Sequence, residues 1–163
     1  MEILITTMQE EDFASMMEIY KDGIEAGNAT FQNATPNWED WNKDHLKNCR
    51  LVAKLENDIV GWAALTPVSG RCVFAGVAEL SIYISLHHTG KKIGTKLLEA
   101  LIKGSEQDNI WTLQSGIFPE NAASLKIHQN TGFRIVGTRE KMGKMNGVWR
   151  DVILLERRSE TII

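Results

Sequence analysis

The sequence predicts a mixed α/β fold, in which about four helices flank a central, twisted, mixed sheet of about seven strands. Three observations support this. Segments of strand-like alternation and of helical periodicity follow one another in the order β-α-α-β-β-β-α-β-α-β-β. Residues 79–101 join a strand to a helix through a glycine-containing turn, an ordinary connection in α/β folds. The length of 163 residues suits one core, so we expect a single domain over residues 1–163.

The first elements are a strand, two helices and a hairpin. Residues 2–7 are predicted to form a strand, and a helix follows over residues 9–26, where apolar residues recur three or four positions apart and Gly27 follows as a stop. Trp38, Trp41, His45 and Leu46 repeat this spacing in a second, short helix. Two strands, 50–55 and 59–67, flank a tight turn.

The second half continues after a loop at residues 68–76. The helix that begins near Ile93 is expected to end near residues 104–108. Pro119 is placed in the first turn of a further helix, where its missing N–H does no harm, and Gly132 caps that helix. The predicted strands are 111–117, one starting at 133–136, and 148–155, the last two joined by a turn at Asn146-Gly147.

Composition narrows the class of protein. Apolar residues make up 43% and charged residues 24% of the chain, as in globular proteins, which argues against disorder. The net charge of −3 argues against nucleic acid as a partner. No apolar run is long enough for a membrane span and no signal pattern begins the chain, so a cytoplasmic protein without a membrane partner is expected. Cys49 and Cys72 are too few for a disulfide framework or a zinc site, and no metal is expected.

The stretch 79–101 carries the first chemical signal. Its strand, residues 80–85, leads into a turn at 87–94 with two glycines and two lysines, and the next helix begins inside that turn. Free N–H groups and the helix dipole make such a helix start a site for an anion, although the same pattern also occurs as a plain connection. Neither a Walker-type loop nor a G-x-G-x-x-G fingerprint is present.

The run from Tyr83 to Leu98 resembles the acetyl-CoA loop of the GNAT superfamily of N-acetyltransferases, usually Q/R-x-x-G-x-G/A. Thr89, Lys92 and Gly94 stand at the Q/R, first-Gly and last positions of that pattern. The predicted order of elements also agrees with the GNAT fold. Further stretches are similar to phosphinothricin and methionine sulfoximine acetyltransferases: 29–31 followed by Pro36, 59–62, 79–83, 121–124, His128, 132–133 and 147–151.

The resemblance implies acetyl-CoA as cosubstrate and a set of residues that hold it. The strand backbone is expected to meet the acyl group where the strand separates from its neighbour, the turn to bind the pyrophosphate, and the following helix to contact the pantetheine arm. Lys91 and Lys92 are also explained as a solvated helix start, and Asn121 and Ser124 as helix-capping residues. The residues are Ile82, Tyr83, Ile84, Gly90, Lys91, Lys92, Ile93, Gly94, Thr95, Asn121 and Ser124.

Two residues are candidates for catalysis. Amide formation needs a neutral amine, so a base must remove a proton, and Glu79 precedes the strand expected to hold the thioester. His128 stands where many GNAT enzymes have a tyrosine that protonates the departing thiolate, and a histidine is able to serve there. The plainer alternatives are a solvated carboxylate at the sheet edge and a structural histidine.

An amine pocket is expected from Thr30, Phe31, Phe74 and Trp149, with Trp62 and Tyr83 as further candidates, although large aromatic residues are core residues by default. Arg150 and Asp151 could bind the substrate or pair at the sheet edge, and we expect them to pair. Relatives that acetylate phosphinothricin carry an arginine shortly before the glutamate, whereas residues 73–78 here contain no charge. The identity of the amine therefore stays open.

The sequence thus predicts an acetyl-CoA-dependent acetyltransferase for the primary amine of a small amino acid or analogue. The alternatives are acetylation of a polyamine or a protein N-terminus, and a non-catalytic acyl-CoA-binding module. Apolar residues near Trp38, Trp41 and the terminal hairpin lead us to expect a homodimer.

Overall fold

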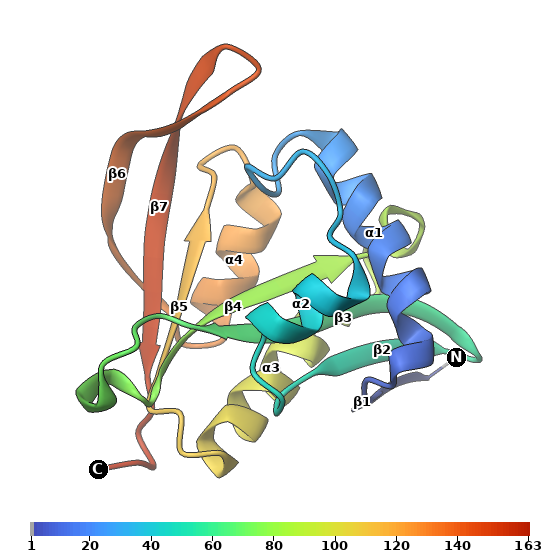
Figure 1. Cartoon of the computed structure of the whole chain (residues 1–163), viewed down its shortest axis with the longest axis horizontal. Coiled ribbons are helices and arrows are strands. Elements are labelled where there is room, and N and C mark those ends of the chain that lie inside the picture. The colour runs from blue at the N-terminus through green and yellow to red at the C-terminus, as the bar shows by residue number, and fades with distance from the viewer. Residues whose placement is uncertain (1) are drawn as a thin grey trace.

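The computed structural model describes residues 2–163 and has one seven-stranded sheet with helices on both faces (Figure 1). The strand order is β1-β2-β3-β4-β5-β7-β6, and among the strand pairs of the described residues only β4–β5 is parallel. The mixed sheet and the order of elements are confirmed. The elements are β1 (Ile3–Thr7), α1 (Phe13–Ala26), α2 (Trp38–Asp44), β2 (Leu51–Leu55), β3 (Asp58–Pro67), β4 (Val77–Ile84), α3 (Ile93–Gln107), β5 (Thr112–Ile117), α4 (Ala122–Asn130), β6 (Arg134–Met145) and β7 (Val148–Arg158). Short 3-10 turns precede α1 (Glu10–Asp12), β4 (Cys72–Phe74) and α3 (Leu86–His88).

Four boundaries differ from the predictions by more than one residue. The second, short helix ends at Asp44, because His45 has an extended backbone (φ −102°, ψ 146°), so His45 and Leu46 lie outside the helix. The first long helix starts at Phe13, after one 3-10 turn. The helix placed at Pro119 starts at Ala122, because the Asn121 side chain caps it by accepting a hydrogen bond from the Ser124 N–H (3.3 Å). The last strand extends to Arg158, since its final residues pair with the start of β5.

Alternation along β3 divides the core between the two faces of the sheet. Ala63 and Leu65 belong to a cluster with Leu97 and Leu101 of α3, whereas Trp62 and Ala64 face Met16 and other residues of α1. Trp41 of α2 joins the second cluster and is only 1% exposed. The Trp41 side chain itself is therefore not exposed to a second subunit, and the predicted interface near Trp38 and the terminal hairpin stays a prediction.

The β4–β5 pair holds together for only three residues. Its register runs from Val77 opposite Thr112 to Glu79 opposite Gln114, and among the described residues no pairing continues beyond that point. Trp111 fixes the closed end by donating its backbone N–H to the Gly76 carbonyl oxygen (2.7 Å). A Cβ at residue 76 would lie 2.0 Å from the Trp111 ring, so only glycine fits there. Beyond Glu79 the strands separate and leave a gap in the sheet.

The hairpin of β6 and β7 projects beyond the body of the molecule (Figure 1). Its turn is Asn146-Gly147, as predicted, and both residues have positive φ (51° and 81°), which a tight hairpin turn of this kind requires. The ladder is interrupted between Arg139 and Gly143 by a bulge on β6.

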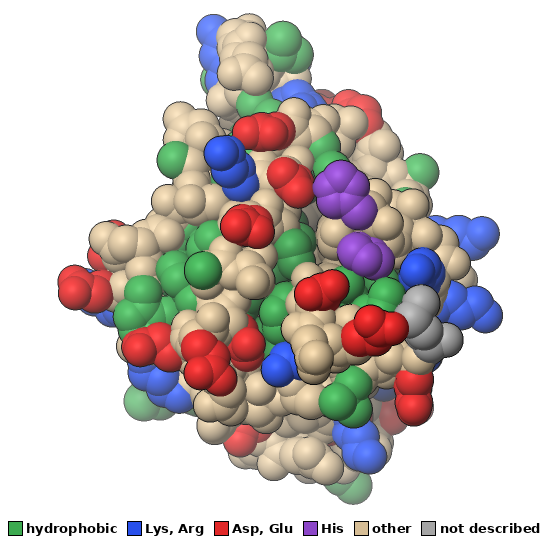
Figure 2. Space-filling view, turned by 90° about the vertical axis from the view of Figure 1, so that its right-hand side faces the viewer, with side chains coloured by type: hydrophobic (Ala, Val, Ile, Leu, Met, Phe, Trp, Pro, Cys, Tyr) green, Lys and Arg blue, Asp and Glu red, His purple; other side chains and the backbone are tan. Residues whose placement is uncertain are grey.

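The face that includes α1 has no continuous basic patch among its described residues (Figure 2). Acidic side chains lie across the middle of this face, and basic ones lie mainly toward its edges (Figure 2). Within residues 2–163, no helix combines the length and apolar character needed to cross a membrane.

Candidate active site

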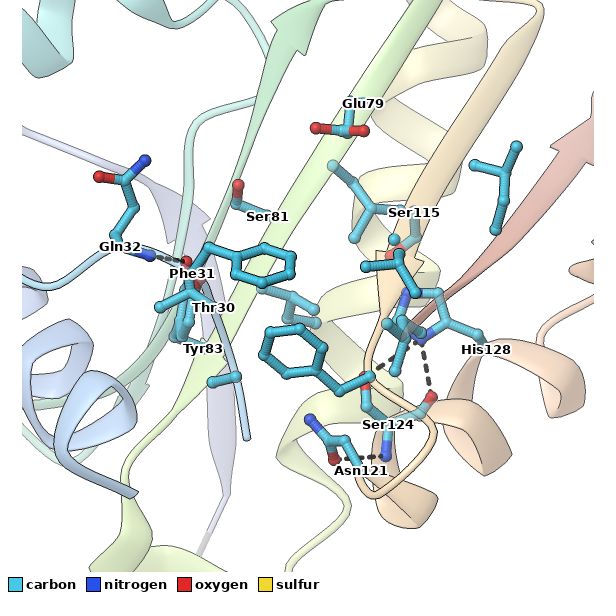
Figure 3. Close-up of a pocket in the computed structure, with 18 of the residues that line it drawn as sticks. Thr30, Phe31, Gln32, Glu79, Ser81, Tyr83, Ser115, Asn121, Ser124 and His128 are labelled. Atoms are coloured by element: carbon cyan, nitrogen blue, oxygen red, sulfur yellow. Dashed lines mark hydrogen bonds between the residues drawn. The ribbon is translucent and has the colours of Figure 1, made fainter. Parts of the chain in front are cut away.

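A cavity of about 460 Å³ lies where β4 and β5 separate. Residues from β4 and from the segment between α1 and α2 face residues from β5 and α4 across it (Figure 3). The hairpin strands contribute a further wall. Among the predicted site residues, those lining this cavity are Thr30, Phe31, Glu79, Ile82, Tyr83, Asn121, Ser124 and His128.

Glu79 lies at the point where the two strands begin to separate. It is exposed, and one of its carboxylate oxygens accepts a hydrogen bond from the Gln114 side-chain amide (3.1 Å). Gln114 is also its partner in the last rung of the parallel ladder. The carboxylate is thus held at the edge of the cavity by one neutral donor, and its other oxygen has no protein partner among the described residues.

The backbone of β4 is unpaired on the side of the gap. The Ser85 N–H donates to the Val60 carbonyl oxygen on β3 (2.8 Å). Alternate residues of a strand direct their N–H groups to the same side, so Ser81 and Tyr83 also face β3. The N–H of Ile82 then faces the gap left by β5. A hydrogen-bond donor in the wall of a cavity suits a carbonyl oxygen that gains negative charge.

His128 is buried at 1% exposure, and its Nδ1 lies 2.8 Å from the backbone oxygen of Ser124 in the preceding helical turn. A carbonyl oxygen only accepts, so the neutral ring carries its proton on Nδ1. Nε2 is then a lone-pair acceptor with no partner among the described residues. Burial lowers the pKa of His128 below its usual value, against the opposing effect of the Ser124 carbonyl. The geometry favours an acceptor over the proton donor predicted from the resemblance.

This burial gives a prediction for stability. A lowered pKa in the folded protein means that the unfolded chain binds a proton that folded His128 does not. The stability that neutral, buried His128 contributes is therefore present above the pKa of the unfolded chain, near 6.5, and it is lost as the pH falls from there toward the pKa of the folded protein. His45, also desolvated, acts in the same direction. In urea unfolding, we expect the free-energy gap between wild type and His128→Asn to narrow from pH 7.5 to pH 5.5. An equal gap at both pH values would contradict the assignment.

Asn121 ties α4 to the segment between α1 and α2. Besides capping α4, it donates from Nδ2 to the Asn28 carbonyl oxygen (3.3 Å). Arg150 holds the same segment, because it donates to the Gly27 carbonyl oxygen (3.0 Å) and to the Asn28 side chain (2.8 Å). It also pairs with Glu120 and lies 4.1 Å from the centre of the Phe118 ring. The expected pairing of Arg150 with Asp151 was wrong: Arg150 clamps an otherwise irregular segment.

Phe31 is ordered by a close fit to the hairpin. Its ring meets Phe118 edge to face at 4.9 Å, and a Cβ at Gly143 would come within 2.9 Å of it. Behind this wall, Tyr83 packs on Tyr20 and Trp62 at 4.7 and 5.1 Å. Burial raises the pKa of the Tyr83 hydroxyl, which stays protonated at neutral pH.

The start of α3 provides free backbone donors, as expected for an anion site. Lys92 is in the left-handed region (φ 59°), caps the helix without a side-chain bond, and accepts the first helical hydrogen bond from Lys96 (3.1 Å). The N–H groups of Ile93, Gly94 and Thr95 come before this first hydrogen bond, so they have no acceptor within the helix. Packing also favours glycine at position 94, because a Cβ there would lie 2.9 Å from the Ile127 side chain of α4.

The remaining predicted residues lie apart from the cavity. Ile84, Gly90 and Lys91 belong with the α3 turn and the end of β4, and none of them lines the cavity. Phe74 is exposed, and the Arg71 guanidinium lies over its ring, 5.4 Å from the ring centre. Trp149 is exposed near the hairpin turn, where the Lys144 ammonium group lies over its ring. Conversely, Ser115, Arg139 and Met142 line the cavity and were not predicted. No group of three or more potential metal ligands occurs in residues 2–163.

Fold and site together define a transferase of the acyl type, with an opened parallel strand pair, a carboxylate where the strands begin to separate, and a free helix start near the other end of β4. The model of the family described as "Acetyltransferase (GNAT) domain" matches residues 5–154. The chain belongs to the GNAT acetyltransferase family, and it is an acetyl-CoA-dependent acetyltransferase.

Individual relatives agree in length and fold. The chain is 28% identical to the L-methionine sulfoximine/L-methionine sulfone acetyltransferase of Pseudomonas aeruginosa, over 89% of this chain and 88% of that one. It is 26% identical to the phosphinothricin N-acetyltransferase of Streptomyces coelicolor, over 96% of each chain. The structure of the yncA protein of Salmonella typhimurium with its cofactor acetyl-CoA superposes with a TM-score of 0.88 at 25% identity, covering 97% of this chain and 95% of that one.

Proposed function

We propose that this protein acetylates the primary amine of a small amino acid or amino acid analogue, of the phosphinothricin or methionine sulfoximine type. The observation that carries the proposal is the cavity at the divergence of β4 and β5, with Glu79 at its vertex and the Ile82 N–H in its wall. The names of the relatives from Pseudomonas and Streptomyces support this class of acceptor.

The residues present fit acetyl-CoA. The first N–H groups of α3, together with Lys91 and Lys92, would hold the pyrophosphate, and Asn121 and Ser124 would border the pantetheine arm. When bound, acetyl-CoA supplies an acetyl group activated as a thioester. The Ile82 N–H would donate a hydrogen bond to the acetyl carbonyl oxygen, which stabilises the charge that develops there during attack.

Glu79 would accept a proton from the ammonium form of the acceptor, directly or through a water molecule. Its exposed position at the edge of the cavity supports this role, since the proton can then pass to solvent. His128 would act through the Nε2 lone pair, as an acceptor that orients a neighbouring donor. The departing thiolate would then take the proton that the amine nitrogen gives up as the amide forms.

Release of free thiol from acetyl-CoA tests the proposal. The acceptors are amino acids, phosphinothricin, methionine sulfoximine, a polyamine and a peptide with a free N-terminus. We expect the compact amino acid analogues to give the highest kcat/KM, because aromatic side chains line part of the cavity and Glu79 is the one carboxylate among its described lining residues. If the polyamine or the peptide is turned over faster, it belongs to the true acceptor class and the proposed one is wrong. If no amine gives thiol release, the protein only binds acetyl-CoA.

We also propose a homodimer in the cytoplasm, as expected from the sequence. The apolar side chains exposed on the projecting hairpin support an interface there: Ile135, Val136, Met142, Val148 and Trp149. A monomer mass by light scattering at micromolar concentration would contradict the dimer.

A further inference from the structure

Two side chains of opposite charge line the cavity within the described part of the chain: Glu79 on β4 and Arg139 on β6. Arg139 is paired across the ladder with Val152, which also lines the cavity, and directly paired residues direct their side chains to the same face of a sheet. The guanidinium group therefore belongs to the hairpin wall, across the gap from the strand that carries Glu79. A cavity of this kind suits an acceptor that has both a cationic and an anionic group.

Arg139 has no ion pair, hydrogen bond or aromatic contact within residues 2–163, whereas every other arginine of the chain has at least one. Five donors on a permanently charged group are thus left for water or a ligand. The partners of the others are Asn42 for Arg50, Phe74 for Arg71, Glu156 for Arg134, Asn28 and Glu120 for Arg150, Glu106 for Arg157, and backbone oxygens near the C-terminus for Arg158.

The bulge on β6 explains why Arg139 and Met142 both line the cavity. In a regular strand, residues three positions apart face opposite sides of the sheet. Here the register jumps from Arg139 to Gly143, and Lys141 is in the left-handed region (φ 49°). The Asp151 carboxylate holds this conformation by accepting a hydrogen bond from the Lys141 N–H (2.8 Å). Bulges commonly redirect a side chain beside an active site.

We propose that Arg139 is a specificity-determining residue that binds an anionic group of the amine acceptor, either its α-carboxylate or an acidic group on its side chain. Asp151 is a positioning residue, because it fixes the bulge that presents Arg139. The inference rests on the proposed function, in that the cavity receives the acceptor. Guanidinium and carboxylate or phosphinate groups match each other in two parallel hydrogen bonds, so neutral analogues of the same size would bind less well.

Matched acceptor pairs test the proposal and separate the two sources of negative charge. The first pair is an amino acid and its amide, which lacks the α-carboxylate, and the second is phosphinothricin and methionine sulfone, whose side chain carries no charge. We expect Arg139→Gln to raise KM about 10- to 100-fold for the anionic member of one pair. The KM for its neutral partner and for acetyl-CoA should stay unchanged. Arg139→Lys should restore part of the preference, since it keeps the charge without the two-pronged geometry.

Two variants serve as controls. Arg134→Gln removes the same charge from the same strand but not from the cavity lining, and should leave all preferences unchanged. Asp151→Ala should reproduce the selective loss of Arg139→Gln, and Asp151→Asn, which keeps an oxygen acceptor for Lys141, should largely restore it. An equal loss for anionic and neutral acceptors, or a wild type without preference in either pair, would overturn the role of Arg139 while leaving the transferase intact.

Failure of the proposed function is distinguishable from failure of the Arg139 assignment, because no thiol would then be released from acetyl-CoA with any amine. The role of Arg139 is still decided in that case by thermal unfolding in the presence of free CoA. A rise in Tm with the anionic member of a pair, present in wild type and absent in Arg139→Gln, would support it. The same rise in both proteins, or in neither, would overturn it.

Discussion

Replacing Thr95 with glutamate is expected to abolish the stabilisation that acetyl-CoA gives to the protein. Thr95 is the third residue of α3, and its N–H is one of the free donors at the helix start. A carboxylate there would face the pyrophosphate, and like charges about 4 Å apart repel by roughly 4 kcal/mol at an effective dielectric constant near 20. We expect the Kd for acetyl-CoA to rise on the order of 10²-fold or more.

Thermal unfolding measures this loss. Acetyl-CoA at about 100 times its Kd stabilises the native state by about 2.7 kcal/mol, and a 100-fold weaker Kd leaves about 0.4 kcal/mol. Glutamate in the first turn favours the helix itself, so unliganded Thr95→Glu should unfold no earlier than wild type. Thr95→Gln, of the same length without the charge, is the control. A full rise in Tm with Thr95→Glu would mean that the pyrophosphate lies elsewhere.

The structure also shows why Thr95 is a better probe than Gly94. From the sequence, Gly94 is expected to belong to the turn that binds the pyrophosphate, so a charged substitution there would look like a direct test of binding. In the fold it packs against Ile127, so any side chain would also separate α3 from α4. Loss of binding in such a variant would not distinguish repulsion of the ligand from damage to the helix pair.

Most of the fold could be predicted because local pattern determines it. The alternation along β3 places Trp62 and Leu65 on opposite faces, and each face finds the helix with the complementary apolar stripe. The start of α4 was predicted incorrectly because two signals compete within three residues. Pro119 is compatible with a first helical turn, but the side chain of Asn121 forms the cap.

The site was predicted less completely, for reasons of register and distance. Glu79 and His128 could be proposed because each lies in a recognisable local context. Arg139 could not, since its direction depends on a bulge held by Asp151, ten residues along the chain from Lys141. The proton position on His128 likewise depends on a contact with the Ser124 carbonyl oxygen, which residue type alone does not specify.

Replacing Glu79 with glutamine is expected to lower kcat by about 10²- to 10⁴-fold, the range for loss of a positioned acid or base. Glutamine keeps the size of the side chain and an oxygen that can still accept the hydrogen bond from Gln114. The structure around the strand divergence should therefore persist. Affinity for acetyl-CoA should change little, because Glu79 lies apart from the helix start that would hold the pyrophosphate.

The pH dependence identifies the cause of the loss. The substrate amine is mostly protonated at neutral pH, and a base that removes its proton matters most there. As the pH rises, free amine becomes available without a base, so the ratio of wild-type to Glu79→Gln rates should fall. Glu99→Gln, which removes an exposed carboxylate from α3 outside the cavity lining, should behave as wild type throughout. If Glu79→Gln also matches wild type at every pH, Glu79 is structural, and the amine loses its proton to solvent before it enters the cavity.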